Sequence, residues 1–164
     1  MKKEYTKSFR VKLPHLAVLL VAFVISSFVQ SQEANRYTGQ HFKSLRWLEG
    51  TWKGTGSGEA PFYEKLEFVN DTLMQITYYS DSTLTKSSTD GGVYLSGGKI
   101  YHNYKSAVWE LKQMKDKSAE FAPIKRASNS FTWKYNSPDE WTATLFTAGN
   151  PKGKVYRLQR YKKL

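Results

Sequence analysis

Two histidines, His41 and His102, are the side chains after residue 31 best suited to moving a proton near neutral pH. His102 lies between Ile100 and Tyr104, and a strand would place these three residues on one face. If that face points inward, His102 lines an interior cavity. The alternative is a buried or rim histidine that only satisfies its own hydrogen bonds. Because no second histidine stands at metal-ligand spacing, we expect no zinc site.

Two glutamates, Glu64 and Glu67, stand three residues apart in a run rich in strand-forming residues. Side chains alternate along a strand, so these carboxylates point to opposite faces and do not form a catalytic pair. Glu64 shares its face with Leu66 and Phe68, and a buried carboxylate is costly without a partner. Two interpretations therefore stay open: Glu64 is a ligand anchor inside the fold, or it forms a salt bridge at the rim.

Several kinds of chemistry are excluded by what the sequence lacks. It has no cysteine, which excludes disulfides, zinc–thiolate sites, iron–sulfur clusters and cysteine nucleophiles. It has no Gly-x-Ser-x-Gly nucleophile motif and no Walker phosphate loop. The alternating glycines Gly54, Gly56 and Gly58 precede no helical pattern, so we expect them to bend a strand or make room for neighbouring side chains. We expect no cofactor.

Aromatic residues make up 15% of the chain, with tyrosine more frequent than phenylalanine. Aromatic walls with a few polar groups are typical of small-molecule pockets, although a narrow barrel is also filled solid by its own side chains. The sequence leaves both interpretations open. The candidates to line a cavity are Trp52, Tyr63, Tyr78, Tyr79, Tyr94, Tyr104, Trp109, Phe131, Trp133 and Trp141.

Residues 1–31 have the three-part pattern of a secretory signal peptide. A basic start is followed by a nearly unbroken apolar run from Leu16 to Val29, and small residues precede Gln32. We therefore expect cleavage and export, to the periplasm or out of the cell. The alternative is an uncleaved membrane anchor, for which the apolar run is short because a spanning helix needs ~20 apolar residues.

A flexible leader is expected over residues 32–40 and a single domain over residues 41–164. His41–Leu48 has apolar residues at helical spacing, and Gly50 then ends the helix. From there on, β-branched and aromatic residues are dense and turn residues recur. The predicted strands are Thr51–Gly58, Phe62–Val69, Thr72–Ser80, Leu84–Thr89, Gly92–Ser96, Lys99–Tyr104, Ala107–Met114, Ala119–Ala122, Ser130–Tyr135, Glu140–Thr147 and Lys154–Tyr161.

Short connections between these strands predict an antiparallel meander. Asn70-Asp71 and Gly97-Gly98 suit two-residue hairpin turns, and Asp90-Gly91 is a further turn cluster. A meander this long leaves two unpaired edges unless it closes on itself. We therefore predict an all-β fold: a single antiparallel up-and-down β-barrel of about ten strands with a short N-terminal helix. A two-layer sandwich is the alternative.

The triplet Gly50-Thr51-Trp52, placed after a helical turn and at the first strand, resembles the Gly-x-Trp signature of lipocalins and other calycin barrels. The resemblance implies that Trp52 closes one end of the barrel and that an arginine of the last strand packs over it. Arg157 and Arg160 are both available, and strand parity favours Arg160. A guanidinium over an indole contributes ~1 kcal/mol through the cation–π interaction.

The chain also resembles small bacterial barrel families related to nitrobindin. In these, a leading Leu-x-Gly-x-Trp is followed by a glutamate on the second strand and a Trp-Glu pair in mid-chain, which correspond here to Trp52, Glu64 and Trp109-Glu110. Haem-binding relatives of this type carry an iron-ligating histidine near the chain end. This sequence has no histidine after His102, so a haem role would require His102 to serve from a different strand.

These observations predict an exported lipocalin-like barrel that binds a small hydrophobic or amphipathic molecule. The expected lining residues are Glu64, Tyr78, His102 and Trp109, and Trp52 and Arg160 are assigned to structure. One alternative is a barrel-type isomerase or hydrolase that uses His102 and Glu64 as acid and base.

A second alternative follows from charge. The formal net charge is +11, and basic residues gather after Pro151. A non-enzymatic envelope module would use this basic C-terminal strand, with peripheral contact to an anionic membrane surface. No nucleic-acid-binding motif is present, so we expect no nucleic-acid partner. The sequence does not indicate an oligomeric state.

Overall fold

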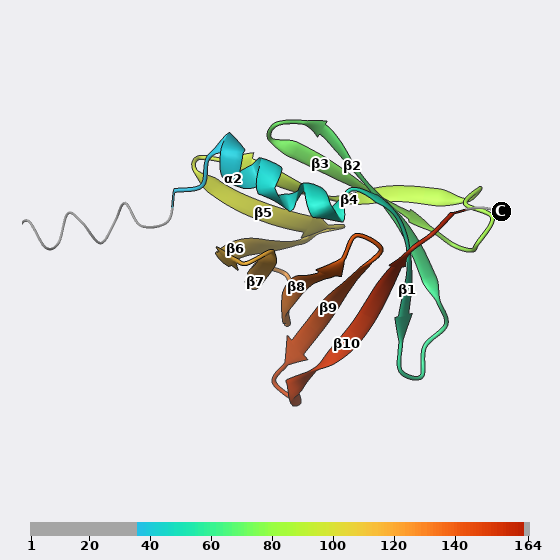
Figure 1. The fold of residues 1–164 in the computed structure, drawn as a ribbon. Helices are drawn as coiled ribbons and strands as arrows, with labels where there is room; N and C mark the ends of the chain where they lie inside the picture. The colour runs from blue at the N-terminus through green and yellow to red at the C-terminus, as the bar shows by residue number, and fades with distance from the viewer. Residues whose placement is uncertain (1–35, 163–164) are drawn as a thin grey trace, which may run out of the picture. The chain divides into compact units, whose positions relative to one another are not determined.

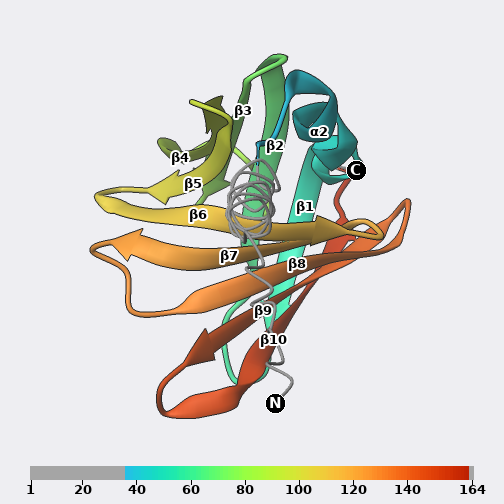
Figure 2. The same ribbon diagram turned by 90° about the vertical axis from the view of Figure 1, so that its left-hand side faces the viewer.

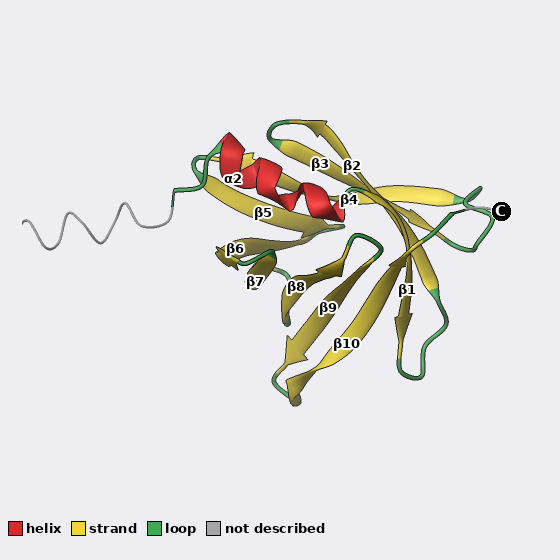
Figure 3. Ribbon diagram, in the orientation of Figure 1, coloured by secondary structure: helices red, strands yellow, loops and turns green. Residues whose placement is uncertain are grey.

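The computed structural model describes residues 36–162. The expected signal peptide and the first residues of the expected leader, residues 1–35, lie outside the described part. In the described part, a short helical segment precedes ten strands (Figure 3). No helix among residues 36–162 is long and apolar enough to cross a membrane.

The ten strands form one closed antiparallel barrel (Figures 1 and 2). Each strand pairs with its neighbour in the chain, and the first strand pairs with the last. This confirms the predicted up-and-down barrel, and the sandwich alternative is wrong. The strands are β1 (Gly50–Gly56), β2 (Phe62–Asn70), β3 (Leu73–Tyr79), β4 (Ser87–Ser96), β5 (Lys99–Tyr104), β6 (Ala107–Lys115), β7 (Ser118–Lys125), β8 (Ser130–Ser137), β9 (Glu140–Thr147) and β10 (Asn150–Arg160).

Closure depends on the pairing of β1 with β10. The register places Trp52 opposite Arg160 near one end of this pair and Gly56 opposite Tyr156 near the other. With both outer strands paired, neither presents a free row of backbone groups to solvent. The same register brings the Gly-x-Trp tryptophan and the last-strand arginine together.

The helical segment consists of one turn of α-helix, α2 (Gly39–Lys43), continued by the 3-10 helix η1 (Ser44–Leu48). The predicted helix is confirmed, but it begins at Gly39, inside the expected leader. Phe42, Leu45 and Leu48 are fully buried, as their helical spacing predicts.

This segment reaches across one end of the barrel. The ring of Phe42 meets Phe68 of β2 edge to face at 5.5 Å. Trp47 meets Tyr135 of β8 at 5.9 Å, and Ser44 Oγ donates a hydrogen bond to Met114 Sδ of β6. Contacts with three separated strands show that the helical segment covers this end.

The largest difference from the predicted strands is at β4, and β7 and β10 are also longer than predicted. Leu84–Thr89 and Gly92–Ser96 were expected as two strands around an Asp90-Gly91 turn, but β4 runs unbroken from Ser87 to Ser96. Its pairing with β3 shifts register next to Gly91, which is typical of a β-bulge. A Cβ at Gly91 would lie 3.0 Å from the ring of Tyr78. Gly91 therefore makes room for the ring of Tyr78. Sequence alone does not distinguish this role from that of a glycine in a turn.

The core fills the part of the barrel beneath the helical segment. Its side chains come from the helices and from inward positions on most strands, and they include Phe42, Leu45, Leu48, Leu66, Met74, Val93, Ile100, Leu111 and Ala119. These side chains fill this end of the barrel and leave the rest of the interior unfilled.

Candidate functional site

The covered end of the barrel is closed by Trp52 and Arg160. The guanidinium carbon of Arg160 lies 4.2 Å from the centre of the Trp52 ring. The indole nitrogen of Trp52 donates a hydrogen bond to the Leu48 carbonyl at 2.7 Å. Arg160 also donates to the carbonyls of Pro138 and Glu49. These contacts join the first strand, the last strand and the helix, which is the arrangement that the calycin resemblance implies.

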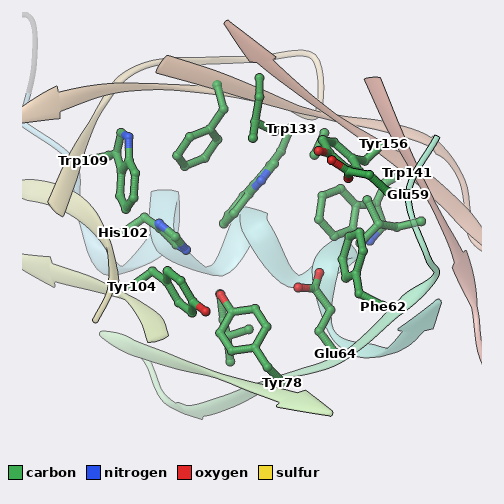
Figure 4. A pocket seen from close by; sticks show the side chains of 15 residues that line it. Glu59, Phe62, Glu64, Tyr78, His102, Tyr104, Trp109, Trp133, Trp141 and Tyr156 are labelled. Carbon is green, nitrogen blue, oxygen red and sulfur yellow. The ribbon is translucent and has the colours of Figure 1, made fainter. Parts of the chain in front are cut away.

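A cavity of about 490 Å³ occupies the remaining interior (Figure 4). Its wall is mainly aromatic, with a few titratable groups among the rings. The interior is therefore not packed solid. The lining residues are Glu59, Phe62, Glu64, Ile76, Tyr78, His102, Tyr104, Trp109, Phe131, Trp133, Trp141, Ala143, Leu145, Tyr156 and Leu158.

Two glycines of β1 make room for aromatic rings of this wall. A Cβ at Gly54 would collide with the ring of Phe62 on β2. A Cβ at Gly56 would lie 2.7 Å from the ring of Tyr156 on β10. Glycine at these positions lets Phe62 and Tyr156 meet edge to face at 5.9 Å across the first strand.

Glu64 is buried in the cavity wall with 7% of its surface exposed. Among the residues that the structure describes, its carboxyl group has no hydrogen bond and no ion pair. Burial raises the pKa of Glu64 to about 8, because the charged form loses its hydration. The carboxyl group is therefore mostly neutral at pH 7. Figure 4 shows it directed into the cavity.

The two neighbouring glutamates have other environments. Glu67 is exposed, as strand parity predicts, and pairs with Lys65 on the same outer face at 2.9 Å. A salt bridge at the rim does exist, but Glu59 forms it with Lys154. The rim interpretation of Glu64 is thus not what the structure shows.

His102 lies on β5 among aromatic rings. The ring centres of Trp109 and Trp133 are both 5.3 Å from its own, and that of Phe131 is 5.4 Å away. Its Nδ1 is buried and has no hydrogen-bond partner among the described residues. Burial lowers the pKa of His102 to about 3, so the imidazole is neutral at pH 7.

Tyr78 and Trp109 complete the set of four predicted lining residues. Tyr78 meets Tyr104 edge to face at 5.0 Å, and its pKa is raised, first by burial and then by the Glu64 carboxylate. The indole nitrogen of Trp109 donates to the carbonyl of Asn129 at 2.7 Å, which fixes the ring. All four predicted residues therefore line the same cavity.

Seven lining residues were not among the predicted candidates: Glu59, Phe62, Ile76, Ala143, Leu145, Tyr156 and Leu158. Phe62 and Tyr156 lie on predicted strands and share parity with Glu64 and Leu158, so parity was a usable signal. Glu59 lies in the connection between β1 and β2, where no periodicity indicates direction.

No group of three His, Asp or Glu side chains within residues 36–162 is arranged to hold a metal ion. On β10, where the haem-binding relatives carry their ligand, Tyr156 and Leu158 line the cavity and no histidine is present. A haem role would therefore still require His102 of β5, which lines the same cavity.

Comparison with known proteins identifies no family. No family model matches the chain, and no curated protein matches it. Among solved structures, a redesigned β-barrel, b11L5F_LGL, has 12% sequence identity and a TM-score of 0.37 over 73% of this chain and 96% of that chain. The redesigned β-barrel mFAP1 bound to DFHBI has 15% identity and a TM-score of 0.35 over 72% of this chain and 98% of that chain. At these values the likeness is one of barrel architecture alone.

Proposed function

We propose that this protein is an exported, lipocalin-like barrel that binds a small hydrophobic or amphipathic molecule in its interior. The observation that carries the proposal is the aromatic cavity of about 490 Å³ inside the closed barrel. Moving apolar ligand surface from water into such a wall contributes roughly 25 cal/mol per Å². The few polar groups in the wall would orient the guest.

The calycin part of the proposal is supported by the closed end of the barrel. Gly50 and Trp52 begin β1, and Arg160 of β10 lies over the indole. With one end sealed in this way, a guest would enter from the end where Glu59 and Tyr156 lie.

A fluorescence titration tests the binding function. The neutral apolar dye N-phenyl-1-naphthylamine should accept excitation energy from the wall tryptophans and saturate at one dye per protein. Ala143→Phe places a ring in the cavity and should weaken binding at least tenfold. Val155→Phe adds the same ring at a position of β10 that is 53% exposed, and it should leave binding unchanged. Equal binding by both variants would contradict an interior site.

Acid–base catalysis is the second candidate function, and one observation favours it. Glu64 and His102 line the same cavity, and burial favours the neutral form of each, an acid and a base. A catalytic histidine is usually oriented by a hydrogen bond to its second nitrogen, whereas Nδ1 of His102 has no partner in the described part of the chain. We therefore place binding before catalysis.

Export is tested by N-terminal sequencing of the protein purified from its own cells. A chain that begins at Gln32 would support signal cleavage, and an intact N-terminus would contradict it. Native mass spectrometry of the same sample reports any small molecule that the protein retains.

A non-enzymatic envelope module would be favoured by a packed interior together with a continuous basic face. The interior has a cavity, and three of the four basic residues of β10 are engaged in other contacts. Lys154 pairs with Glu59, Arg157 approaches Glu140 at 3.6 Å and Arg160 covers an indole. Peripheral membrane contact stays a prediction, and salt-sensitive binding to anionic vesicles would support it.

A further inference from the structure

The carboxyl group of Glu64 is a buried titratable group with no partner among the described residues. A glutamate that is 7% exposed and surrounded by aromatic rings costs free energy unless something pairs with it. Within residues 36–162 nothing does, and the carboxyl group is directed into the cavity (Figure 4). A guest in the cavity could therefore pair directly with this carboxyl group.

The rest of the wall favours a guest that carries positive charge. Aromatic ring faces are negative and attract organic cations, and the rings of Tyr78, Trp133 and Trp141 line the same space as Glu64. No lysine or arginine is among the lining residues, so nothing cationic in the wall repels such a guest. The other acidic residue of the lining, Glu59, lies at the rim.

The remaining titratable groups that face Glu64 do not oppose a cation. They are Tyr78 on β3, Tyr104 and His102 on β5, Tyr156 on β10 and Glu59, whose charge is balanced by Lys154. Tyr78 and Tyr156 are neutral at pH 7, because burial raises the pKa of each. The imidazole of His102 is also neutral, because burial lowers its pKa.

We propose that the preferred guest is an aromatic or apolar amine in its ammonium form, with the ammonium paired to Glu64 and the apolar part against the wall tryptophans. This inference rests on the proposed binding function and names its ligand class. On binding, the protonated carboxyl group of Glu64 loses its proton to solvent and becomes the counter-ion of the ammonium. No covalent bond forms or breaks apart from that O–H bond.

Two matched probes separate charge from shape. Tryptamine and tryptophol share an indole and a two-carbon chain, and they differ in carrying an ammonium or a hydroxyl group. Tryptamine should bind at least tenfold more tightly, because a charge-assisted hydrogen bond is stronger than a neutral one. Glu64→Gln should remove this preference. Glu67→Gln, on the outer face of the same strand, should retain it.

Proton release gives an independent readout. Calorimetric titrations with tryptamine in buffers of different ionisation enthalpy should detect proton release at pH 7 that falls strongly by pH 9, because burial raises the pKa of Glu64. The Glu64→Gln variant should release none at either pH.

The outcomes distinguish the two proposals. If N-phenyl-1-naphthylamine binds in the cavity but tryptamine binds no more tightly than tryptophol, the amine inference is overturned and the binding function stands. A preference that survives Glu64→Gln also overturns the inference. If the dye and both indoles fail to bind, the binding function itself falls.

Discussion

Replacing Glu64 with glutamine should change how the stability of the protein depends on pH. Folding raises the pKa of this carboxyl group from 4.5 to about 8 by burial. An acid whose pKa is higher in the folded state stabilises the fold fully below pH 4.5, and this contribution is lost as the pH rises toward 8. Each pKa unit corresponds to about 1.4 kcal/mol. The loss is therefore about 3 kcal/mol at pH 7 but only about 1 kcal/mol at pH 5.

Glutamine keeps the shape of the side chain and does not ionise. The free energy of unfolding of Glu64→Gln minus that of the wild type should thus increase by about 2–3 kcal/mol between pH 5 and pH 7. Other titrating groups cancel in this difference because both proteins contain them. Any constant cost of burying the amide also cancels when the two pH values are compared.

Urea unfolding followed by far-UV circular dichroism at pH 5, 6, 7 and 8 measures this difference. Glu67→Gln is the matched control, because Glu67 lies on the same strand with its side chain exposed. Its difference from the wild type should vary by less than about 0.5 kcal/mol over the same range. A stability difference for Glu64→Gln that does not change with pH would refute the burial of a neutral carboxyl group.

Three further substitutions test other parts of the structure. Arg160→Ala removes the cation–π contact and several hydrogen bonds at the closed end and should cost about 2 kcal/mol in urea unfolding, whereas Arg157→Ala, an exposed residue, should cost less than about 0.5. His102→Phe should abolish an acid sensitivity of the fold. Burial lowers the pKa of the wild-type imidazole to about 3. Its contribution to the free energy of unfolding is therefore fully present above pH 6.5 and is lost as the pH falls toward 3. The loss is about 2 kcal/mol at pH 5. Gly54→Ala inserts a methyl group against a phenyl ring and should cost about 1–3 kcal/mol, whereas Gly149→Ala, with open space around it, should have little effect. Equal costs for Arg160→Ala and Arg157→Ala, or for Gly54→Ala and Gly149→Ala, would contradict the assigned roles.

Much of the fold follows from local patterns. The two-residue alternation of β8 and β9 placed Phe131, Trp133 and Trp141 inside, because a half-buried strand must alternate. The number of such strands then required closure. The error at β4 has a physical cause. Asp90-Gly91 has turn chemistry, but its glycine serves a bulge that only the neighbouring strand explains.

The sequence predicted about half of the residues that line the cavity. It did not predict whether a cavity exists or how large it is. Parity grouped Glu64 with Leu66, and His102 with Ile100, on faces that the structure turns inward. Whether those faces enclose a cavity depends on the summed side-chain volumes of ten strands and on what the helical segment fills. The register between β1 and β10, which brings Arg160 rather than Arg157 over the indole, is likewise a property of strands far apart in the sequence.

The central claim is that the barrel interior holds a small molecule, and a crystal structure of the protein with N-phenyl-1-naphthylamine tests it most directly. The dye should lie inside the barrel, in contact with Tyr78, Trp133 and Trp141. A dye bound on the outer face of the sheet, or an interior filled by rearranged side chains, would contradict the claim.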